Sequence, residues 1–343
     1  MTLRVAVVGA GFIGADHAAA YVGEDDAELV AIVDPDPDRA AALAGRFGGT
    51  AVPDLDALLT RARPEAASVC VPTGLHRPVV ERLAAAGVHV LLEKPMAPTV
   101  ADCDAIQAAA EAAGIVLMLG LTHRFHAELI EARRLIADGA IGLPRLAQDA
   151  FSFGEHGPWP AWYYDRALSG GGELMHDGVH LVDRLEWLID SPIVEVYGRT
   201  TSYARSIEGV EDGGVAVLAF KNGAIGSLFV NESTYPLRSD AASVPMPGRL
   251  ELEILGTKGS IRYRTWHELI VDIAGEPSRT VTRSDDGEMT REIRAFLDSI
   301  ASRGPPPVGA REGRRGIAII GAIYESERRG RPVRVDELFP PAV

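Results

Sequence analysis

The chain has 343 residues, of which 47% are hydrophobic and 24% are charged, and its formal net charge is −14 at pH 7. This composition is that of a globular protein of about two domains. The negative charge disfavours nucleic-acid binding, because a phosphate backbone repels an acidic surface. The two cysteines imply no disulfide framework, and no apolar run predicts a signal peptide or a membrane span. We therefore expect a cytoplasmic protein.

The chain begins with an apolar run, 3–8, that is typical of a buried strand and leads directly into a glycine-rich turn and a helical pattern. A second strand, 29–33, ends on Asp34, about 20 residues after the third glycine, which is the spacing of the dinucleotide-binding fingerprint. The glycines would admit a pyrophosphate to the helix N-terminus. The cofactor contacts expected here are Gly9, Gly11, Phe12, Ile13, Gly14 and Asp34.

Asp34 also predicts which cofactor is used. Its carboxylate would accept hydrogen bonds from the ribose hydroxyls and repel a 2′-phosphate, so we expect NAD and consider NADP less favoured. Arg39 lies near enough in the sequence to keep NADP as an alternative.

Strands and helices alternate through residues 1–122, which predicts a parallel, doubly wound sheet. The expected helices are 54–61, 76–86 and 99–113, and the expected strands 66–71, 88–92 and 115–120. Ligands of such sheets bind beyond the carboxyl ends of the strands. The cofactor contacts expected there are Pro72, Thr73, His76, Glu93, Lys94 and Pro95. A solvated surface lysine is the alternative for Lys94.

The stretch 170–183 begins with three glycines and continues as a helical pattern. Leu174, Leu181, Leu185 and Leu188 share one stripe of this helix, whereas Glu173, His176, His180 and Asp183 share the opposite side. Two histidines one turn apart among carboxylates indicate a functional face, and a polar face that happens to hold histidine is the alternative. The same spacing suits helical zinc ligands, with His123, His126, His156 or Asp177 as a third ligand, but we expect no metal.

Residues 123–343 are predicted to form a second α/β domain around an open, mostly antiparallel sheet of about five or six strands. The expected strands are 143–153, 194–205, 215–220, 224–231, 249–255 and 260–263, with a hairpin turn at Asn222-Gly223 and a loop over 235–247. The expected helices are 123–138, 290–302 and 311–329, the last of which can pack back on the first domain. An exposed sheet face of this kind needs a partner, so we expect a homo-oligomer.

A proline-broken loop around 155–166 carries several large aromatic side chains, including Trp159, Trp162 and Tyr163. Aromatic side chains in a loop either pack within their own domain or line a pocket, where their faces suit polyhydroxylated rings. Both interpretations are open at this point.

These motifs together resemble one family, the glucose–fructose oxidoreductase / inositol dehydrogenase / rhizopine-catabolism (Gfo/Idh/MocA) family of nicotinamide-dependent oxidoreductases. The resemblance rests on Gly9-x-Gly11-x-x-Gly14, Asp34, Pro72-Thr73-x-x-His76, Glu93-Lys94-Pro95, Arg124-Phe125, Gly170-Gly171-Gly172 and Gly178-x-His180-x-x-Asp183. It implies a Rossmann domain followed by an α/β domain whose sheet forms a dimer or tetramer interface. It also implies hydride transfer between NAD(P) and a ring hydroxyl of a sugar, sugar derivative or cyclitol.

The resemblance further implies that Lys94 and His180 lie in the active site, with His180 as general base and Lys94 as the cation beside the developing alkoxide. Many relatives carry aspartate where this chain has His176, and Asp177 or Asp183 could replace that carboxylate. The expected catalytic residues are Lys94, His176 and His180. The expected substrate contacts are Lys94, His123, Arg124, Trp159, Trp162, Tyr163, His176, Asp177 and His180.

Two other functions remain as alternatives. An enzyme on this fold can retain NAD and use transient oxidation for epimerisation, elimination or glycoside cleavage. A non-catalytic sensor of sugars or dinucleotides is the other, since fold does not fix function.

Overall fold

The computed structural model describes residues 2–153, 159–202, 207–232, 249–264, 268–282 and 287–340. The chain forms two compact units, one made of Met1–Thr122 and Asp286–Arg314 and the other of His123–Asp285 and Arg315–Val343. Residues 286–314 thus group with the first unit and interrupt the continuous second domain, 123–343, that the sequence suggests. The division into independently folding domains stays a prediction.

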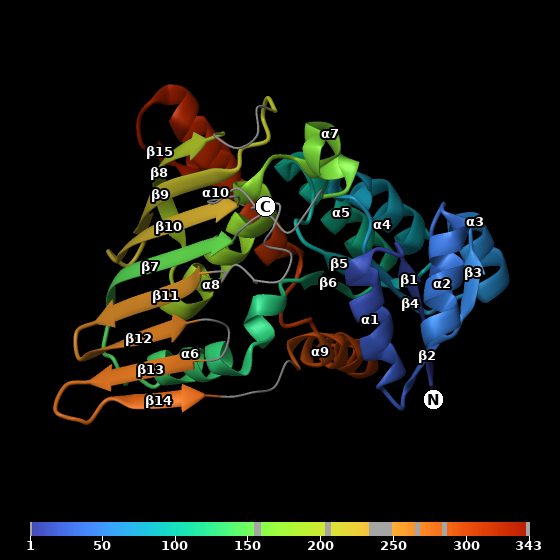
Figure 1. The fold of residues 1–343 in the computed structure, drawn as a ribbon, viewed down its shortest axis with the longest axis horizontal. Helices are drawn as coiled ribbons and strands as arrows, with labels where there is room; N and C mark the ends of the chain where they lie inside the picture. Colours follow the sequence, from blue (N-terminus) through green and yellow to red (C-terminus); the bar gives the residue numbers. More distant parts are fainter. Residues whose placement is uncertain are drawn as a thin grey trace, which may run out of the picture. The chain divides into compact units, whose positions relative to one another are not determined.

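The first unit contains a six-stranded parallel sheet in the order β3-β2-β1-β4-β5-β6 (Figure 1). Its strands are β1 (Leu3–Val8), β2 (Ala27–Val33), β3 (Thr50–Val52), β4 (Ala66–Val69), β5 (His89–Glu93) and β6 (Leu117–Gly120). The order reverses beside β1, which places the ligand-binding switch point at the carboxyl ends of β1 and β4. The predicted doubly wound sheet is confirmed.

The helices of this unit depart from the sequence prediction in two places. They are α1 (Phe12–Val22), α2 (Pro37–Phe47), α3 (Leu55–Ala57), α4 (His76–Ala85), α5 (Val100–Ala113) and α9 (Glu288–Ser302). The helix predicted over 54–61 is one α-helical turn followed by a π-helical turn, Leu58–Ala62. Helix α2 was not predicted, although Asp36 caps it by accepting from two backbone N–H groups and Pro37 opens it, which are helix-start signals.

The second unit contains a nine-stranded sheet in the order β14-β13-β12-β11-β7-β10-β9-β8-β15, in which only β7 and β10 pair in parallel. The strands are β7 (Pro144–Phe153), β8 (Ile193–Thr201), β9 (Gly213–Phe220), β10 (Ile225–Glu232), β11 (Arg249–Gly256), β12 (Gly259–Arg264), β13 (Glu268–Ile273), β14 (Arg279–Thr282) and β15 (Val333–Arg334). A mostly antiparallel sheet is confirmed. The predicted five or six strands are too few, because β13, β14 and β15 were missed. Strands β14 and β15 are short or polar and carry little apolar alternation, whereas β13 is a mostly apolar strand of six residues. Residues 203–205 and the predicted loop 235–247 lie outside the described residues.

Helices cover one face of this sheet. Helix α6 (Ala127–Ala137) lies against β12 and β13, and α8 (Val179–Ile189) lies against β7. Helix α10 (Ala310–Arg329) bonds to β8 through Ser326 and Glu327. The helix predicted to begin at 123 begins at Ala127, after a 3₁₀ turn over Thr122–Phe125.

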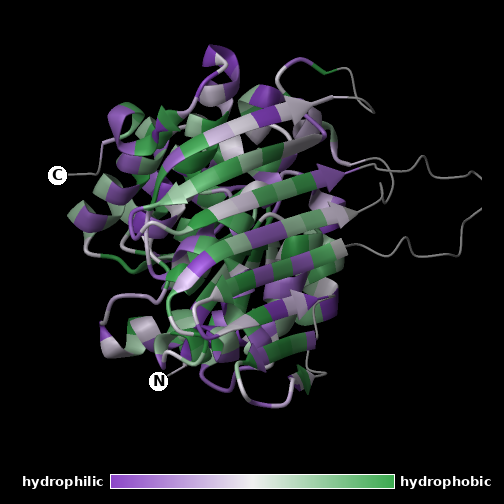
Figure 2. Ribbon diagram, turned by 90° about the vertical axis from the view of Figure 1, so that its left-hand side faces the viewer, coloured by the Kyte–Doolittle hydropathy of each residue, from purple (hydrophilic) through white to green (hydrophobic). Residues whose placement is uncertain are grey.

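The opposite face of the nine-stranded sheet is covered by no helix of this unit among the described residues (Figure 2). Alternate residues of its central strands expose apolar side chains on this face, namely Leu146, Val215, Val217, Ile225 and Phe229. None of the described helices is long and apolar enough to cross a membrane.

Candidate functional site

The three glycines of the turn between β1 and α1 are required for different reasons. Gly9 has a φ of +106°, and a Cβ there would lie 2.4 Å from the carbonyl oxygen of Cys70. A Cβ on Gly14 would lie 2.0 Å from the carbonyl oxygen of Gly9. A Cβ on Gly11 would meet nothing within 4 Å. The turn itself therefore requires Gly9 and Gly14, whereas the space at Gly11 fits the close approach of a phosphate.

Asp34 follows β2 directly and organises this turn. One of its carboxylate oxygens accepts from the backbone N–H of Ala10 at 2.9 Å, and the other accepts from that of Asp36 at 2.9 Å. The predicted contact between Asp34 and a ribose stays a prediction. The guanidinium of Arg39 is paired with Asp36 at 3.0 Å.

The side chains of most polar residues after β4 and β5 are buried inside the first unit. Thr73 and His76 are buried, and the two ring nitrogens of His76 face the carbonyl oxygens of Val71 at 2.9 Å and Met96 at 3.2 Å. Burial lowers the pKa of His76, which favours the neutral ring. His76 thus ties the end of β4 to the segment after β5, and its role in binding cofactor stays a prediction.

Glu93, at the end of β5, belongs to a buried polar network that the sequence did not reveal. Its carboxylate lies 3.0 Å from Nε2 of His17 and 3.1 Å from the backbone nitrogen of Lys94. Nδ1 of His17 lies 2.8 Å from Oγ of Ser68, which lies 2.9 Å from the hydroxyl of Tyr21. Lys94 itself is half-buried.

His17, Glu93 and Glu292 form the one group of metal-ligand side chains found among the described residues, with atoms all within 4.8 Å of one another. The pair His176 and His180 is not part of such a group there. His156 lies outside the described residues.

In the second unit, residues 170–183 form a π-helical turn, Leu174–Gly178, that continues into α8. The four leucines of the apolar stripe are fully buried. The opposite side is buried as well, with Glu173 only 3% exposed, His176 and His180 5% and Asp183 6%. This polar side is therefore not exposed to solvent, and a function for its histidines stays a prediction.

The triple glycine before this helix packs against its own unit. A Cβ on Gly171 would lie 2.4 Å from the hydroxyl of Tyr324, and one on Gly172 would lie 1.8 Å from the carbonyl oxygen of Glu211. The Glu211 carboxylate accepts from the backbone N–H groups of Gly172 and Leu174 at 3.0 Å and from the Tyr324 hydroxyl at 2.8 Å. Glu211 thereby fixes the start of the histidine-bearing helix.

His180 lies in a stack of two imidazoles. The ring of His123 is parallel to that of His180 within 18°, with 3.9 Å between their centroids. The guanidinium of Arg184 lies 2.9 Å from Nδ1 of His123 and also forms a fully buried, two-pronged ion pair with Asp149. The bond from Arg184 to Nδ1 thereby fixes the imidazole of His123 that stacks on His180.

A second ion pair joins the 3₁₀ turn that carries His123 and Arg124 to α8. Arg124 donates two hydrogen bonds to Asp183, at 2.8 and 2.6 Å, and its guanidinium lies 5.6 Å from the ring centroid of Trp187. Of the two carboxylates that could replace the missing aspartate, Asp183 is thus held by Arg124, whereas Asp177 is half-buried.

His176 lies in an aromatic group. The ring of Tyr163 stacks on His176 at 4.3 Å, and Trp162 meets His176 edge-on at 5.9 Å. Trp159 also stacks on Tyr163, with 5.0 Å between their ring centroids, and donates its indole N–H to Glu232. The predicted substrate contacts of this unit therefore form two groups, one around His180 and one around His176.

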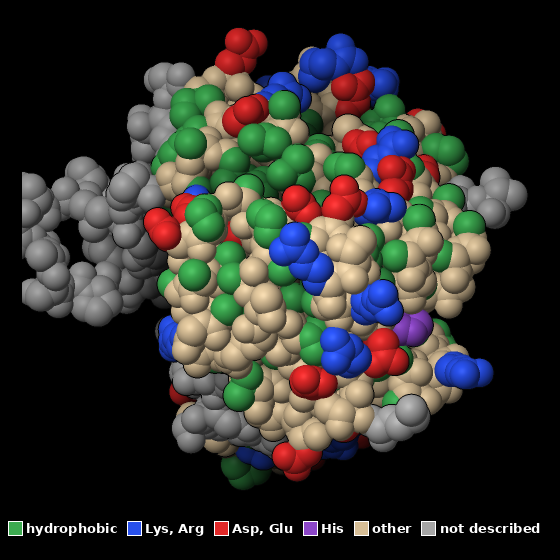
Figure 3. All heavy atoms as spheres, turned by 90° about the vertical axis from the view of Figure 1, so that its right-hand side faces the viewer, with side chains coloured by type: hydrophobic (Ala, Val, Ile, Leu, Met, Phe, Trp, Pro, Cys, Tyr) green, Lys and Arg blue, Asp and Glu red, His purple; other side chains and the backbone are tan. Residues whose placement is uncertain are grey.

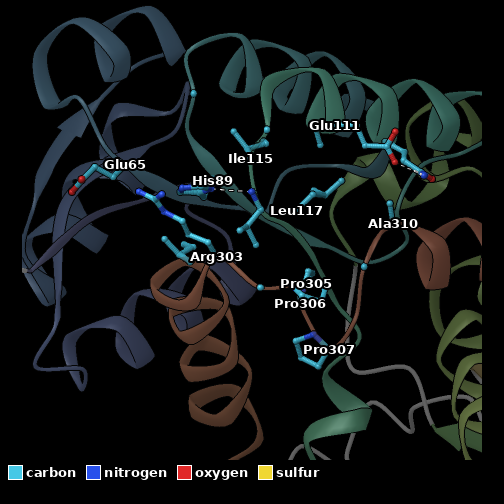
Figure 4. Close-up of a pocket in the computed structure, with 18 of the residues that line it drawn as sticks. Glu65, His89, Glu111, Ile115, Leu117, Arg303, Pro305, Pro306, Pro307 and Ala310 are labelled. Atoms are coloured by element: carbon cyan, nitrogen blue, oxygen red, sulfur yellow. Dashed lines mark hydrogen bonds between the residues drawn. The ribbon is translucent and has the colours of Figure 1, made fainter.

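A hollow of about 1270 Å³ in the first unit lies elsewhere. It opens at the amino ends of the strands, beside Leu3, His89 and Leu117 (Figure 4). Glu65, His89 and Arg303 lie together on one side of it, and Pro305–Pro307 lie on another. Because dinucleotides bind at the carboxyl ends, this hollow is not the cofactor site.

Charge on the molecular surface is mixed. On the face drawn in Figure 3, acidic and basic side chains of the described residues are interspersed, and no continuous basic patch gathers among them.

The sheet order, the glycine turn and the acid at the end of β2 are those of a dinucleotide-binding Rossmann unit. Residues 3–121 match the model of an oxidoreductase family described as an NAD-binding Rossmann fold, and residues 129–262 match the GFO/IDH/MocA C-terminal domain. The chain belongs to the GFO/IDH/MocA family of oxidoreductases, and its cofactor is NAD. The family predicted from the motifs is confirmed.

Similar proteins include the D-glucoside 3-dehydrogenase of Escherichia coli, 27% identical over 97% of both chains. An inositol 2-dehydrogenase of Saccharopolyspora erythraea is 29% identical over 98% of this chain and 96% of its own. Among solved structures, the WlbA dehydrogenase of Bordetella pertussis in complex with NADH and UDP-GlcNAcA matches with a TM-score of 0.83. It is 29% identical, over 97% of this chain and 99% of that one.

Proposed function

We propose that this protein is an NAD-dependent dehydrogenase that acts on a CH–OH group in the ring of a sugar, sugar derivative or cyclitol. The observation that carries the proposal is the buried histidine side of α8, where His180 is fixed by a parallel stack on His123. A buried, oriented imidazole suits proton transfer to or from a substrate hydroxyl. The similar proteins act on glucosides and inositol, which supports this substrate class.

NAD, when bound, would accept the hydride from the substrate carbon. Gly9, Gly11 and Gly14 would hold its pyrophosphate at the start of α1, and Asp34 its ribose. His180 would take the hydroxyl proton as the C–H bond breaks. The ammonium of Lys94 would stabilise the oxygen as negative charge develops on it, an effect worth about 3 kcal/mol for a well-placed group in a dry site.

The aromatic group around His176 would form the substrate-binding part of the second unit. Trp162 and Tyr163 are half-buried beside His176 and present ring faces of the kind that pack on the C–H faces of sugars. We propose that His176 binds a substrate hydroxyl where relatives use aspartate, with Asp177 as the neighbouring carboxylate. Arg124 would act indirectly, because Asp183 already holds its guanidinium.

The open face of the nine-stranded sheet supports a homo-oligomer. Its exposed apolar side chains, among them Val217, Ile225 and Phe229, would be covered by a second copy, giving a dimer or tetramer. A cytoplasmic location fits the two unpaired cysteines, Cys70 and Cys103.

The decisive experiment is a screen of sugars, sugar acids and inositols for NADH formation, followed by Lys94→Met and His180→Asn variants with the substrate found. Each variant should lower kcat at least about tenfold while NADH binding, followed by fluorescence, is retained. Normal turnover in both variants would overturn the assignment. Tightly retained NAD with no net NADH formation on any substrate would favour the epimerase, lyase or glycosidase alternative instead.

A further inference from the structure

His17, Glu93 and Glu292 come from three distant parts of the first unit and meet in its interior. His17 lies on α1, Glu93 ends β5, and Glu292 lies on α9, which returns to this unit after the chain has formed most of the second one. His17 and Glu292 are fully buried and Glu93 nearly so. Two buried carboxyl groups this close cannot both be ionised without a large cost, so the group needs a proton or a cation.

His17 joins Glu93 to a chain of buried hydroxyl groups. Its Nε2 lies 3.0 Å from Oε1 of Glu93, and its Nδ1 lies 2.8 Å from Oγ of Ser68. The Ser68 hydroxyl lies 2.9 Å from the hydroxyl of Tyr21. Burial raises the pKa of Tyr21, which keeps its proton in place. This chain holds the Glu93 carboxyl group in one orientation.

Glu292 is in a different situation. One carboxylate oxygen accepts from the Thr122 hydroxyl at 3.2 Å, whereas Oε1 is buried with no hydrogen-bond partner among the described residues. Burial raises the pKa of Glu292 well above its usual range, and the negative charges of Glu93 and Glu288 raise it further. A neutral acid removes the cost of an unpaired buried charge.

We propose that Glu93, fixed by His17, is a positioning residue that holds the backbone N–H of Lys94, and that Glu292 carries a proton beside it. The bond from Lys94 N–H to Oε2 of Glu93 is the last link, at 3.1 Å. Through it, His17 on α1 determines where the segment bearing Lys94 leaves β5. The effect on turnover rests on the proposed role of Lys94, but the proton on Glu292 and the bond to Lys94 do not.

A divalent metal ion is the rival occupant of the group. One histidine and two glutamates form a donor set that zinc can use, and each has a supporting hydrogen bond. The separation of His17 and Glu93, however, is that of a direct hydrogen bond, and a metal ion between them would need that bond to open. A proton needs no such change.

The test compares Glu292→Gln with Glu93→Gln, using Glu288→Gln on the same helix as the matched control. Glutamine copies a protonated acid, so Glu292→Gln should keep kcat within about twofold. Glu93→Gln replaces one of the two carboxylate oxygens with an NH2 group, so it cannot keep both the bond to His17 and the bond to Lys94, and it should lower kcat at least about tenfold. The KM for substrate and NADH binding should change little in either variant. Glu288→Gln should behave like the wild-type protein.

Two readouts do not depend on activity. Infrared spectra should show the carbonyl band of a protonated acid in the wild-type protein and in Glu93→Gln, but not in Glu292→Gln. Hydrogen exchange of peptides that end on either side of Lys94 should show faster exchange of its amide in Glu93→Gln only. If these hold while Lys94→Met turns over normally, the proposed function fails and the positioning inference stands.

The inference is overturned if the wild-type protein lacks the acid band, or if Glu292→Gln damages turnover and amide protection as much as Glu93→Gln does. It is also overturned if protein purified without a tag contains stoichiometric divalent metal that Glu292→Gln loses.

Discussion

Each unit buries a carboxyl group near a histidine, and the two units avoid the cost of a buried, unpaired negative charge in different ways. In the second unit Asp149 meets the guanidinium of Arg184, which also bonds to His123. In the first unit Glu292 faces other acids, and burial favours its protonated form. A guanidinium and a proton compensate the carboxyl group differently, because only the proton is lost as pH rises. The two clusters should therefore differ in how they respond to mutation and to pH.

The largest expected effect on stability follows from removing the guanidinium of Arg184. Arg184→Met would leave Asp149 buried without its partner, so we expect the free energy of unfolding to fall by about 3–5 kcal/mol. Urea unfolding followed by circular dichroism measures this change. The double variant Arg184→Met/Asp149→Leu is the control, and it should recover most of the loss because no unpaired charge remains. A double variant as unstable as the single one would show that Arg184 acts by packing alone.

A smaller, pH-dependent effect is expected for Glu292→Gln. At neutral pH the unfolded chain ionises Glu292 while the native protein keeps it protonated, so the native state binds more protons. The stability that this proton provides is complete below the ordinary pKa of glutamate and is lost as pH rises toward the raised native value. The wild-type protein should therefore lose stability with rising pH relative to Glu292→Gln, by at most about 1.4 kcal/mol per pH unit.

Urea unfolding of both proteins between weakly acidic and weakly alkaline pH measures this difference. Glu288→Gln is the comparison variant here, because the Glu288 charge also raises the pKa of Glu292 and its removal should move the loss of stability to lower pH. Parallel stability curves for the wild-type protein and Glu292→Gln would show that Glu292 is ionised in the native state, and the contrast between the two clusters would disappear.

The parts of the molecule that local patterns encode were predicted well. The parallel sheet follows from strands and helices of regular length, and the cofactor turn follows from the spacing of Gly9, Gly14 and Asp34. Two of the strands missed in the second sheet, β14 and β15, are short or polar and form its two edges, whereas the missed β13 is mostly apolar and pairs on both sides. The histidine side of α8 was identified, but its burial could not be, because the residues that cover it are distant in sequence.

Neither cluster was predicted, although each left a signal. Arg184 lies in register with Leu181 and Leu188 on the apolar stripe of α8, and Glu292 lies one turn before the buried Phe296 of α9. A charged residue on an apolar stripe indicates a buried partner. The partner itself, Asp149 or Glu93, depends on contacts between distant segments that spacing along one helix cannot supply.

The smallest expected effect separates the two functions of His123, which stacks on His180 and accepts from Arg184. His123→Phe keeps a ring against His180 but removes the acceptor, so we expect a loss of about 1–2 kcal/mol in the free energy of unfolding. Turnover should fall only a few-fold, since the stack remains. His123→Ala removes both and should lower kcat further at similar substrate KM. If His123→Phe and His123→Ala have equal kcat, the stack does not orient His180, and the bond to Arg184 alone accounts for the role of His123.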